Sequence, residues 1–129
     1  MSPKHILLVD DEGDIREVAA LSLRTVGGWR VSTADGGSSG IAMARAERPD
    51  AILLDVMMPD LDGPATIARL NDDPQTRDIP VILLTAKAQS ADRRRFAELG
   101  VAGTLTKPFD PMTLTDQITT ILAREDQAA

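Results

Sequence analysis

Short apolar runs alternate with stretches of helical spacing along the chain, five times over. The runs rich in Ile, Leu and Val predict strands near residues 5–10, 30–34, 51–55, 79–85 and 102–106. The first, third and fourth runs are almost continuously apolar, which is typical of strands buried on both faces of a parallel sheet. Five β-α units with crossovers of this length predict an α/β fold with helices on both faces of the sheet.

The segments between these runs show the period of amphipathic helices. The first predicted helix stops at Gly27-Gly28. Its apolar face comprises Ile15, Val18, Ala19, Ser22, Leu23 and Val26. A weaker, alanine-rich helix is predicted over 38–47, and Pro64 suits the first turn of a third helix that carries Ile67 and Leu70.

Two further helices are predicted in the second half of the chain. The fourth lies near 90–99 and ends at Gly100, a residue that readily adopts a left-handed conformation. In the last helix Asp110 is expected to cap the first turn with Pro111 at the first helical position. Its buried stripe comprises Leu114, Ile118, Ile121 and Leu122. We therefore expect one domain over residues 1–129, with a core of about 4–124.

Composition and charge narrow the class of protein. The chain has 129 residues, 43% of them hydrophobic, and a net charge of −6. An acidic chain with three aromatic residues is a poor candidate for direct binding of DNA or RNA, which favours basic surfaces and stacking rings. No apolar run is long enough to span a bilayer or to form a signal peptide, and there is no cysteine, so we expect a cytoplasmic protein without membrane insertion.

Charged residues follow the predicted strands at the point where each strand ends. Asp10 and Asp11 follow the first strand, Asp55 closes the third, and Lys107 follows the fifth. In an open parallel sheet these ends meet at one edge, where ligands bind. Two carboxylates about 4 Å apart repel by roughly 4 kcal/mol at an effective dielectric near 20, so a hard cation such as Mg²⁺, Mn²⁺ or Ca²⁺ is expected to join them.

The same edge is suited to phosphoryl chemistry. A carboxylate beside Mg²⁺ can accept a phosphoryl group, and Lys107 and the hydroxyl of Thr85 can contact its oxygens. Each feature alone also has an ordinary structural reading: the acidic pair as a helix cap, Thr85 as a β-branched strand residue, and Lys107-Pro108 as a turn. Asp62-Gly63 is interpreted as a turn only, and His5 as structural.

Four segments together resemble the receiver domain of bacterial response regulators over essentially the whole chain. They are Ile6 to Glu12, Asp55 to Gly63, Pro80 to Ala86, and Lys107-Pro108-Phe109. The resemblance implies a flavodoxin-like (βα)5 fold with strand order 2-1-3-4-5. It also implies a two-component signalling protein of the stand-alone, chemotaxis-regulator-like kind.

The resemblance assigns a role to each residue of the site. Asp55 would be the phosphoacceptor, Thr85 the switch hydroxyl and Lys107 the lysine that pairs with the phosphoryl group. Mg²⁺, with Mn²⁺ as an alternative, would be held by Asp10, Asp11, Asp55 and the Met57 carbonyl. The donor would be a sensor histidine kinase or a histidine phosphotransfer protein. By the same analogy the bond from Lys107 to Pro108 is cis.

Some positions bear on how the signal leaves the site. The family usually has Tyr or Phe at the position of Thr104, so the usual aromatic switch is missing here. Phosphorylation can still change the surface formed by the fourth helix, fifth strand and fifth helix. Met57 and Lys87 flank the site where the family tunes dephosphorylation. Arg93-Arg94-Arg95 is a basic cluster that reads either as a solvated helix face or as a docking site for an acidic protein.

Three functions compete on these residues. The first is a phosphorylation-controlled interaction module that is no enzyme beyond its own phosphorylation and dephosphorylation, and whose downstream target is a protein. The second is a phosphatase or phosphotransferase, which would favour a catalytic acid two residues after Asp55, where Met57 stands. The third is a degenerate receiver that signals by contacts alone, which the complete set of site residues disfavours.

Overall fold

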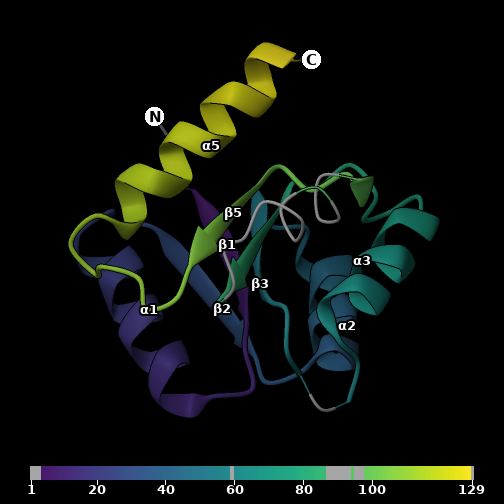
Figure 1. Cartoon of the computed structure of the whole chain (residues 1–129), viewed down its shortest axis with the longest axis horizontal. Coiled ribbons are helices and arrows are strands. Elements are labelled where there is room, and N and C mark those ends of the chain that lie inside the picture. Colours follow the sequence, from purple (N-terminus) through teal and green to yellow (C-terminus); the bar gives the residue numbers. More distant parts are fainter. Residues whose placement is uncertain (1–3, 59, 87–93, 95–97, 129) are drawn as a thin grey trace.

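The protein forms a five-stranded sheet covered by helices on both faces (Figure 1). The structure, a computed structural model, describes residues 4–58, 60–86, 94 and 98–128. The strands are β1 His5–Val9, β2 Arg30–Ala34, β3 Ala51–Asp55, β4 Val81–Thr85 and β5 Gly103–Thr106. The described helices are α1 Gly13–Thr25, α2 Gly37–Glu47, α3 Gly63–Asp72 and α5 Leu114–Ala128.

All strand pairs are parallel and the sheet order is β2-β1-β3-β4-β5, which confirms the predicted topology. Successive side chains of each strand point to opposite faces of the sheet. Ile6 and Leu8 pack into the core beneath α1 and α5, whereas Leu7 and Val9 pack into the core beneath α2 and α3. Each strand therefore needs apolar residues at successive positions, which explains the continuous runs in the sequence.

Three strands are shorter than predicted, at ends where backbone geometry changes. The run at 79–85 becomes a strand only from Val81, because Pro80 has no N–H and Ile79 donates to Thr76 O in a preceding turn. The backbone N–H of Asp10 still donates to Ala34 O at 3.1 Å, but the chain leaves the sheet there. β5 begins at Gly103, one residue later than predicted.

The buried face of α1 differs from the predicted face. Ala19, Ser22 and Leu23 are buried as predicted, but Val18 and Val26 are about half exposed and Ala20 is buried in their place. Val26 is the C-cap residue of α1, and its backbone is still right-handed, with its N–H donating to Ser22 O at 2.8 Å. The chain then turns at Gly28, whose φ of +67° is left-handed.

The caps of the later helices refine two predictions. Asp62 is the N-cap of α3, where its side chain accepts from Ala65 N at 2.9 Å, so the interpretation of Asp62-Gly63 as a turn only is wrong. Pro64 lies in the first turn of α3 as predicted. Asp110 accepts from Met112 N at 2.9 Å, but residues 111–113 form a turn and α5 begins at Leu114, so the prediction of Pro111 as its first residue is wrong.

The end of the fourth predicted helix is described, although most of the helix is not. Residues 87–93 and 95–97 lie outside the described part, as do the side chains of 125–128. Gly100 has φ +79°, the left-handed conformation expected of a residue that ends a helix. Of the described helices, none combines the length and apolar character that a membrane span requires.

Candidate phosphoryl and metal site at the carboxyl edge of the sheet

The predicted site residues lie at neighbouring strand ends. Asp10 directly follows β1, Asp55 ends β3, Thr85 ends β4 and Lys107 directly follows β5. Parallel register places Val9 beside Leu54 and Asp55 beside Leu84, so these ends meet at the same edge of the sheet. For Asp10, Asp55 and Thr85 the local reason is the apolar run that buries β1, β3 and β4 up to the strand end. β5 before Lys107 is only partly buried.

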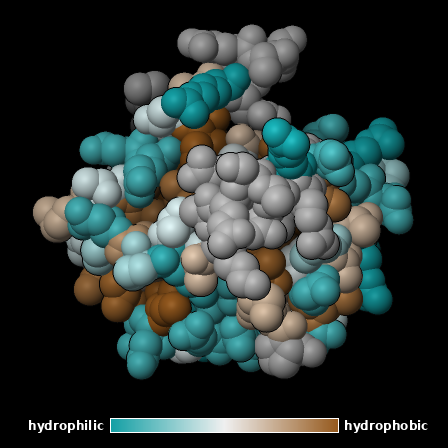
Figure 2. All heavy atoms as spheres, in the orientation of Figure 1, coloured by the Kyte–Doolittle hydropathy of each residue, from teal (hydrophilic) through white to brown (hydrophobic). Residues whose placement is uncertain are grey.

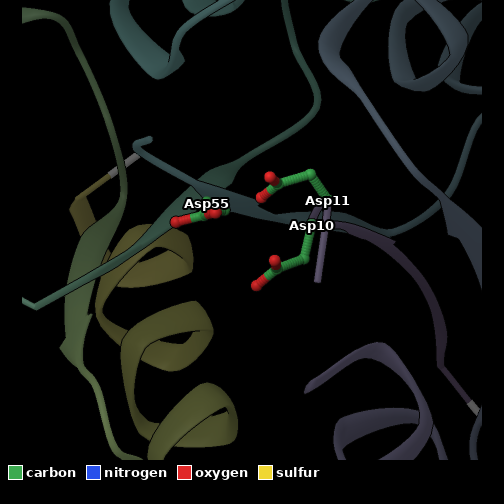
Figure 3. Close-up of side chains that lie close together, drawn as sticks. All are labelled: Asp10, Asp11 and Asp55. Carbon is green, nitrogen blue, oxygen red and sulfur yellow. The ribbon is translucent and has the colours of Figure 1, made fainter. Parts of the chain in front are cut away.

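Three carboxylates gather at this edge. Asp10, Asp11 and Asp55 each offer one oxygen, and these oxygens lie within 4.8 Å of one another. Figure 3 shows Asp10 and Asp11 at the end of β1 pointing toward the same space as Asp55 on β3. Asp10 and Asp55 are buried, whereas Asp11 is exposed. The arrangement therefore has two desolvated charges and one that faces solvent.

Lys107 holds two of the carboxylates together. Its Nζ lies 3.1 Å from Asp10 Oδ2, 3.1 Å from Asp55 Oδ1 and 3.7 Å from Glu12 Oε1. The side chain is only 14% exposed. The peptide bond from Lys107 to Pro108 is cis, as predicted. The backbone is fixed at this point as well, because Lys107 N donates to Thr85 O at 2.8 Å.

Burial and neighbouring charge shift the protonation of this group. Burial, followed by repulsion from Asp10, raises the pKa of Asp55 from 3.8 to about 6, although Lys107 and the Met57 N–H act in the opposite direction. Burial alone would lower the pKa of Lys107, but its close contacts with the negative carboxylates of Asp10 and Asp55 outweigh burial and raise that pKa. Lys107 therefore stays charged, and Asp55 is ionised above about pH 6.

Two buried oxygens of the cluster accept no hydrogen bond from the described residues. They are Asp10 Oδ2 and Asp55 Oδ2. The 3.1 Å contact of Asp10 Oδ2 with Lys107 Nζ is an ion pair that lacks the angles of a hydrogen bond. By contrast, Asp10 Oδ1 accepts from Glu12 N at 2.9 Å. Together with exposed Asp11, these carboxylate oxygens that accept no hydrogen bond form an oxygen-only donor set that suits Mg²⁺.

Met57 and Thr85 complete the rim. Met57 N lies 3.4 Å from Asp55 Oδ1 and donates to it, while the Met57 side chain is 79% exposed. Thr85 is buried at the end of β4, where it pairs with Thr106 of β5. Thr104 pairs with Leu83 and lines a depression of about 340 Å³ between β5 and α5. Lys87, Arg93 and Arg95 lie outside the described residues, and Arg94 is exposed.

Two residues of this region were not predicted. Glu12 reaches Lys107 from the start of α1, and its position directly after the acidic pair was the available signal. Asp60 accepts hydrogen bonds from Gly37 N and Ser38 N at the start of α2. No local pattern indicates a contact across 23 residues. His5 lies at the opposite edge, where its Nε2 is 2.9 Å from Ser32 Oγ, as expected of a structural residue.

A sequence comparison decides the family to which these features belong. The profile of the response regulator receiver domain matches residues 6–119. The chain belongs to this family. Receiver domains act in two-component signalling and bind Mg²⁺ at an acidic pocket, which corresponds here to the cluster of Asp10, Asp11 and Asp55.

Curated relatives of this receiver are longer proteins. It is 46% identical to the response regulator PleD of Caulobacter vibrioides over 85% of its own length and 24% of that protein. It is 38% identical to the probable transcriptional regulator ycf27 of Guillardia theta over 98% of its length and 48% of that protein. The receiver thus spans about half, or less, of the curated relatives it matches.

Solved structures share the fold of this receiver. The chemotaxis protein CheY4 of Vibrio cholerae superposes with a TM-score of 0.86 at 29% identity, covering 93% of this chain and 99% of that one. The receiver domain of sensor histidine kinase PA1611 from Pseudomonas aeruginosa superposes with a TM-score of 0.80 at 32% identity, covering 95% and 97%. That structure has a magnesium ion coordinated in its active site cleft.

Proposed function

We propose that Asp55 accepts a phosphoryl group from the phosphohistidine of a sensor histidine kinase or a histidine phosphotransfer protein. The observation that carries the proposal is the environment of its two oxygens. Oδ1 is held by Lys107 Nζ and the Met57 N–H, while buried Oδ2 accepts no hydrogen bond from the described residues. One oxygen is thus fixed in place and the other is available as the nucleophile.

The transfer requires little of the protein beyond position and charge. A carboxylate oxygen of Asp55 forms a bond to phosphorus as the phosphorus–nitrogen bond of the phosphohistidine breaks, and the imidazole leaves. Lys107 neutralises the phosphoryl oxygens from its place between Asp10 and Asp55, and Thr85 is the hydroxyl at the end of the neighbouring strand. Mg²⁺ held by Asp11, Asp55, the Met57 carbonyl and, through water, Asp10 would offset further phosphoryl charge.

An apolar depression beside Lys107 supports docking of the donor protein there. It has a volume of about 450 Å³ and is lined by Asp14, Ile15, Val18, Ala86, Lys107, Pro108 and Phe109. Figure 2 shows apolar atoms gathered low on the left, over α1 and the connection from β5 to α5. A partner helix with an apolar face would bring its phosphohistidine next to Asp55.

The output of the proposed switch is a change of protein contacts on the side of the fourth helix, β5 and α5. Half-buried Thr104 replaces an aromatic ring there, so the change would travel through the backbone of β4 and β5, which Lys107 N and Thr85 O join. We propose that residues 1–129 act as one receiver domain in the cytoplasm, with a protein as the downstream target. Its only catalysis would be its own phosphorylation and dephosphorylation.

Intact-mass measurement after incubation with acetyl phosphate and Mg²⁺ tests the proposal. We expect the mass to increase by one phosphoryl group, and to stay unchanged in EDTA or in the Asp55→Asn variant. Asp50→Asn is the matched control, because Asp50 is exposed at the opposite edge of the sheet. Labelling of Asp55→Asn would refute Asp55 as the acceptor, and continuous release of phosphate from small esters would favour the enzyme hypothesis instead.

A further inference from the structure

Helix α2 begins without a cap of its own. Its N-cap residue is Gly36, which has no side chain to accept from the first N–H groups, and its first turn contains no acidic residue. The acceptor comes instead from the connection between β3 and α3. Asp60 Oδ1 lies 3.2 Å from Gly37 N, and Asp60 Oδ2 lies 3.2 Å from Ser38 N. We call these two hydrogen bonds the Asp60 cap.

The packing around the Asp60 cap leaves no room for a side chain at Gly36 or Gly37, where α2 begins. A methyl group on Gly36 would lie 2.8 Å from Asp60 Oδ1, and one on Gly37 would lie 2.5 Å from Thr66 Oγ1. Gly36 has φ −168°, an extended conformation that any residue adopts, so close approach explains the glycine. The connection and the start of α2 are therefore built against each other.

The same connection carries the part of the phosphoryl site that follows Asp55. Met57 N donates to Asp55 Oδ1, and the Met57 carbonyl is the ligand proposed above for Mg²⁺. At its far end the connection is closed by Gly63 N, which donates to Val56 O at 2.8 Å. Thr66 Oγ1 also donates to Asp62 O at 2.8 Å. Asp60 lies between these fixed points, three positions after Met57.

We propose that Asp60 is a positioning residue that holds the Met57 backbone for Mg²⁺ and thereby couples occupation of the metal site to the start of α2. This inference rests on the proposed Mg²⁺ site. Coupling of this kind is reciprocal: if the Asp60 cap raises the affinity for Mg²⁺, then Mg²⁺ must strengthen the Asp60 cap by the same factor. The two hydrogen bonds also hold the pKa of Asp60 below its usual range, so the carboxylate is charged at neutral pH.

The alternative is a cap that stabilises α2 and does nothing for the metal site. A pair of variants separates the two. Asp60→Ala removes the Asp60 cap, and the double variant Asp60→Ala/Gly36→Ser gives α2 a local cap in the space that the carboxylate leaves. Serine at this position can accept from the second or third N–H of the helix, so it repairs α2 without fixing the connection.

Isothermal titration with MgCl2 and urea unfolding in EDTA give the two readouts. We expect Asp60→Ala to weaken Mg²⁺ binding roughly threefold to tenfold. This is the change expected if most of the free energy of the lost cap is coupled to the metal site. The double variant should regain the urea midpoint of the wild type but not its Mg²⁺ affinity. Asp78→Ala is the control for the lost charge, because exposed Asp78 lies before β4 at the opposite edge.

Hydrogen exchange supplies an independent test. In the wild type, Mg²⁺ should slow exchange of the Gly37 and Ser38 amides by the same factor by which Asp60→Ala weakens Mg²⁺ binding. In Asp60→Ala, Mg²⁺ should leave the exchange rates of these amides unchanged. Wild-type Mg²⁺ affinity in Asp60→Ala, or recovery of that affinity in the double variant, would overturn the inference. Absence of Mg²⁺ binding to the wild type would instead refute the proposed metal site.

Discussion

At the scale of single residues, Lys107 is the cation on which the acidic cluster depends. Among the described residues it is the one whose ammonium group contacts both Asp10 and Asp55. Removal of one partner from a buried ion pair leaves charges that are neither solvated nor neutralised. The cluster without Lys107 would hold two buried carboxylates that repel each other.

We therefore expect Lys107→Met to lower the free energy of unfolding in EDTA by about 1–3 kcal/mol at neutral pH. Mg²⁺ should then stabilise the variant more than it stabilises the wild type, because the ion takes over neutralisation of the carboxylates. Urea unfolding with and without Mg²⁺ measures both effects. Lys4→Met, at the other edge of the sheet, serves as control, and an equal loss in that variant would contradict the argument.

A second residue-scale prediction concerns Thr115 at the start of α5. Its Oγ1 is buried and neither accepts nor donates a hydrogen bond within the described structure. Valine has the same shape without the hydroxyl, so Thr115→Val should raise the free energy of unfolding by up to about 1 kcal/mol. Thr119→Val is the comparison, since Thr119 Oγ1 donates to Thr115 O at 2.8 Å. If thermal unfolding shows Thr115→Val to be the less stable of the two, an unseen partner of the hydroxyl must exist.

At the scale of elements, close contact between α2 and β1 depends on a glycine inside a helix. A methyl group on Gly40 would lie 2.8 Å from Val9 Cγ2. Val9 is buried and β-branched, so it cannot easily move aside. The usual preference of helices for alanine, about 1 kcal/mol over glycine, is thus opposed by packing.

We expect packing to dominate, so that Gly40→Ala lowers the free energy of unfolding by about 1–3 kcal/mol. Ala42→Gly, at an exposed position of the same helix, measures the difference in helix propensity between alanine and glycine separately. It should lower the free energy of unfolding by about 1 kcal/mol. Urea denaturation of the two variants gives the comparison. A stabilised Gly40→Ala protein would mean that α2 can shift away from the sheet at little cost.

The elements also show where sequence patterns were sufficient. The stripe of Leu114, Ile118, Ile121 and Leu122 is buried as predicted, because each of its residues points at the sheet. On α1 the pattern placed Val18 in the core, yet it lines the apolar depression beside Lys107. Local periodicity shows that a helix has an apolar face, but the position of the neighbouring β5–α5 connection decides how much of it is covered.

At the scale of the whole molecule, the charge of Asp55 links stability to pH. Its pKa is raised from 3.8 to about 6, so the folded protein holds this proton more tightly than the unfolded chain does. The stabilisation that this protonation gives is fully present below about pH 4 and is lost as the pH rises through about 6. Ionised, buried Asp55 therefore destabilises the metal-free protein at neutral pH.

We expect Asp55→Asn to match the wild type near pH 4 in EDTA, and to exceed it by about 1–3 kcal/mol of unfolding free energy near pH 7.5. Saturating Mg²⁺ should reverse the order at the higher pH, because the ion binds the deprotonated carboxylates of the wild type. Urea unfolding as a function of pH, with Asp50→Asn as control, tests this. A constant difference between the two proteins across that range would contradict the raised pKa.

The sequence by itself determined that the sheet is parallel and at which edge the site forms, whereas the strand order came from the resemblance to the receiver family. Continuous apolar runs ending in Asp55 or preceding Asp10 and Lys107 carry that information locally. Only the tertiary structure decided which oxygens lack partners, that Glu12 joins Lys107, and that Asp60 caps a helix 23 residues earlier in the chain. These facts depend on distances between segments that the chain brings together from afar, and a pattern of neighbours along the sequence does not contain such distances.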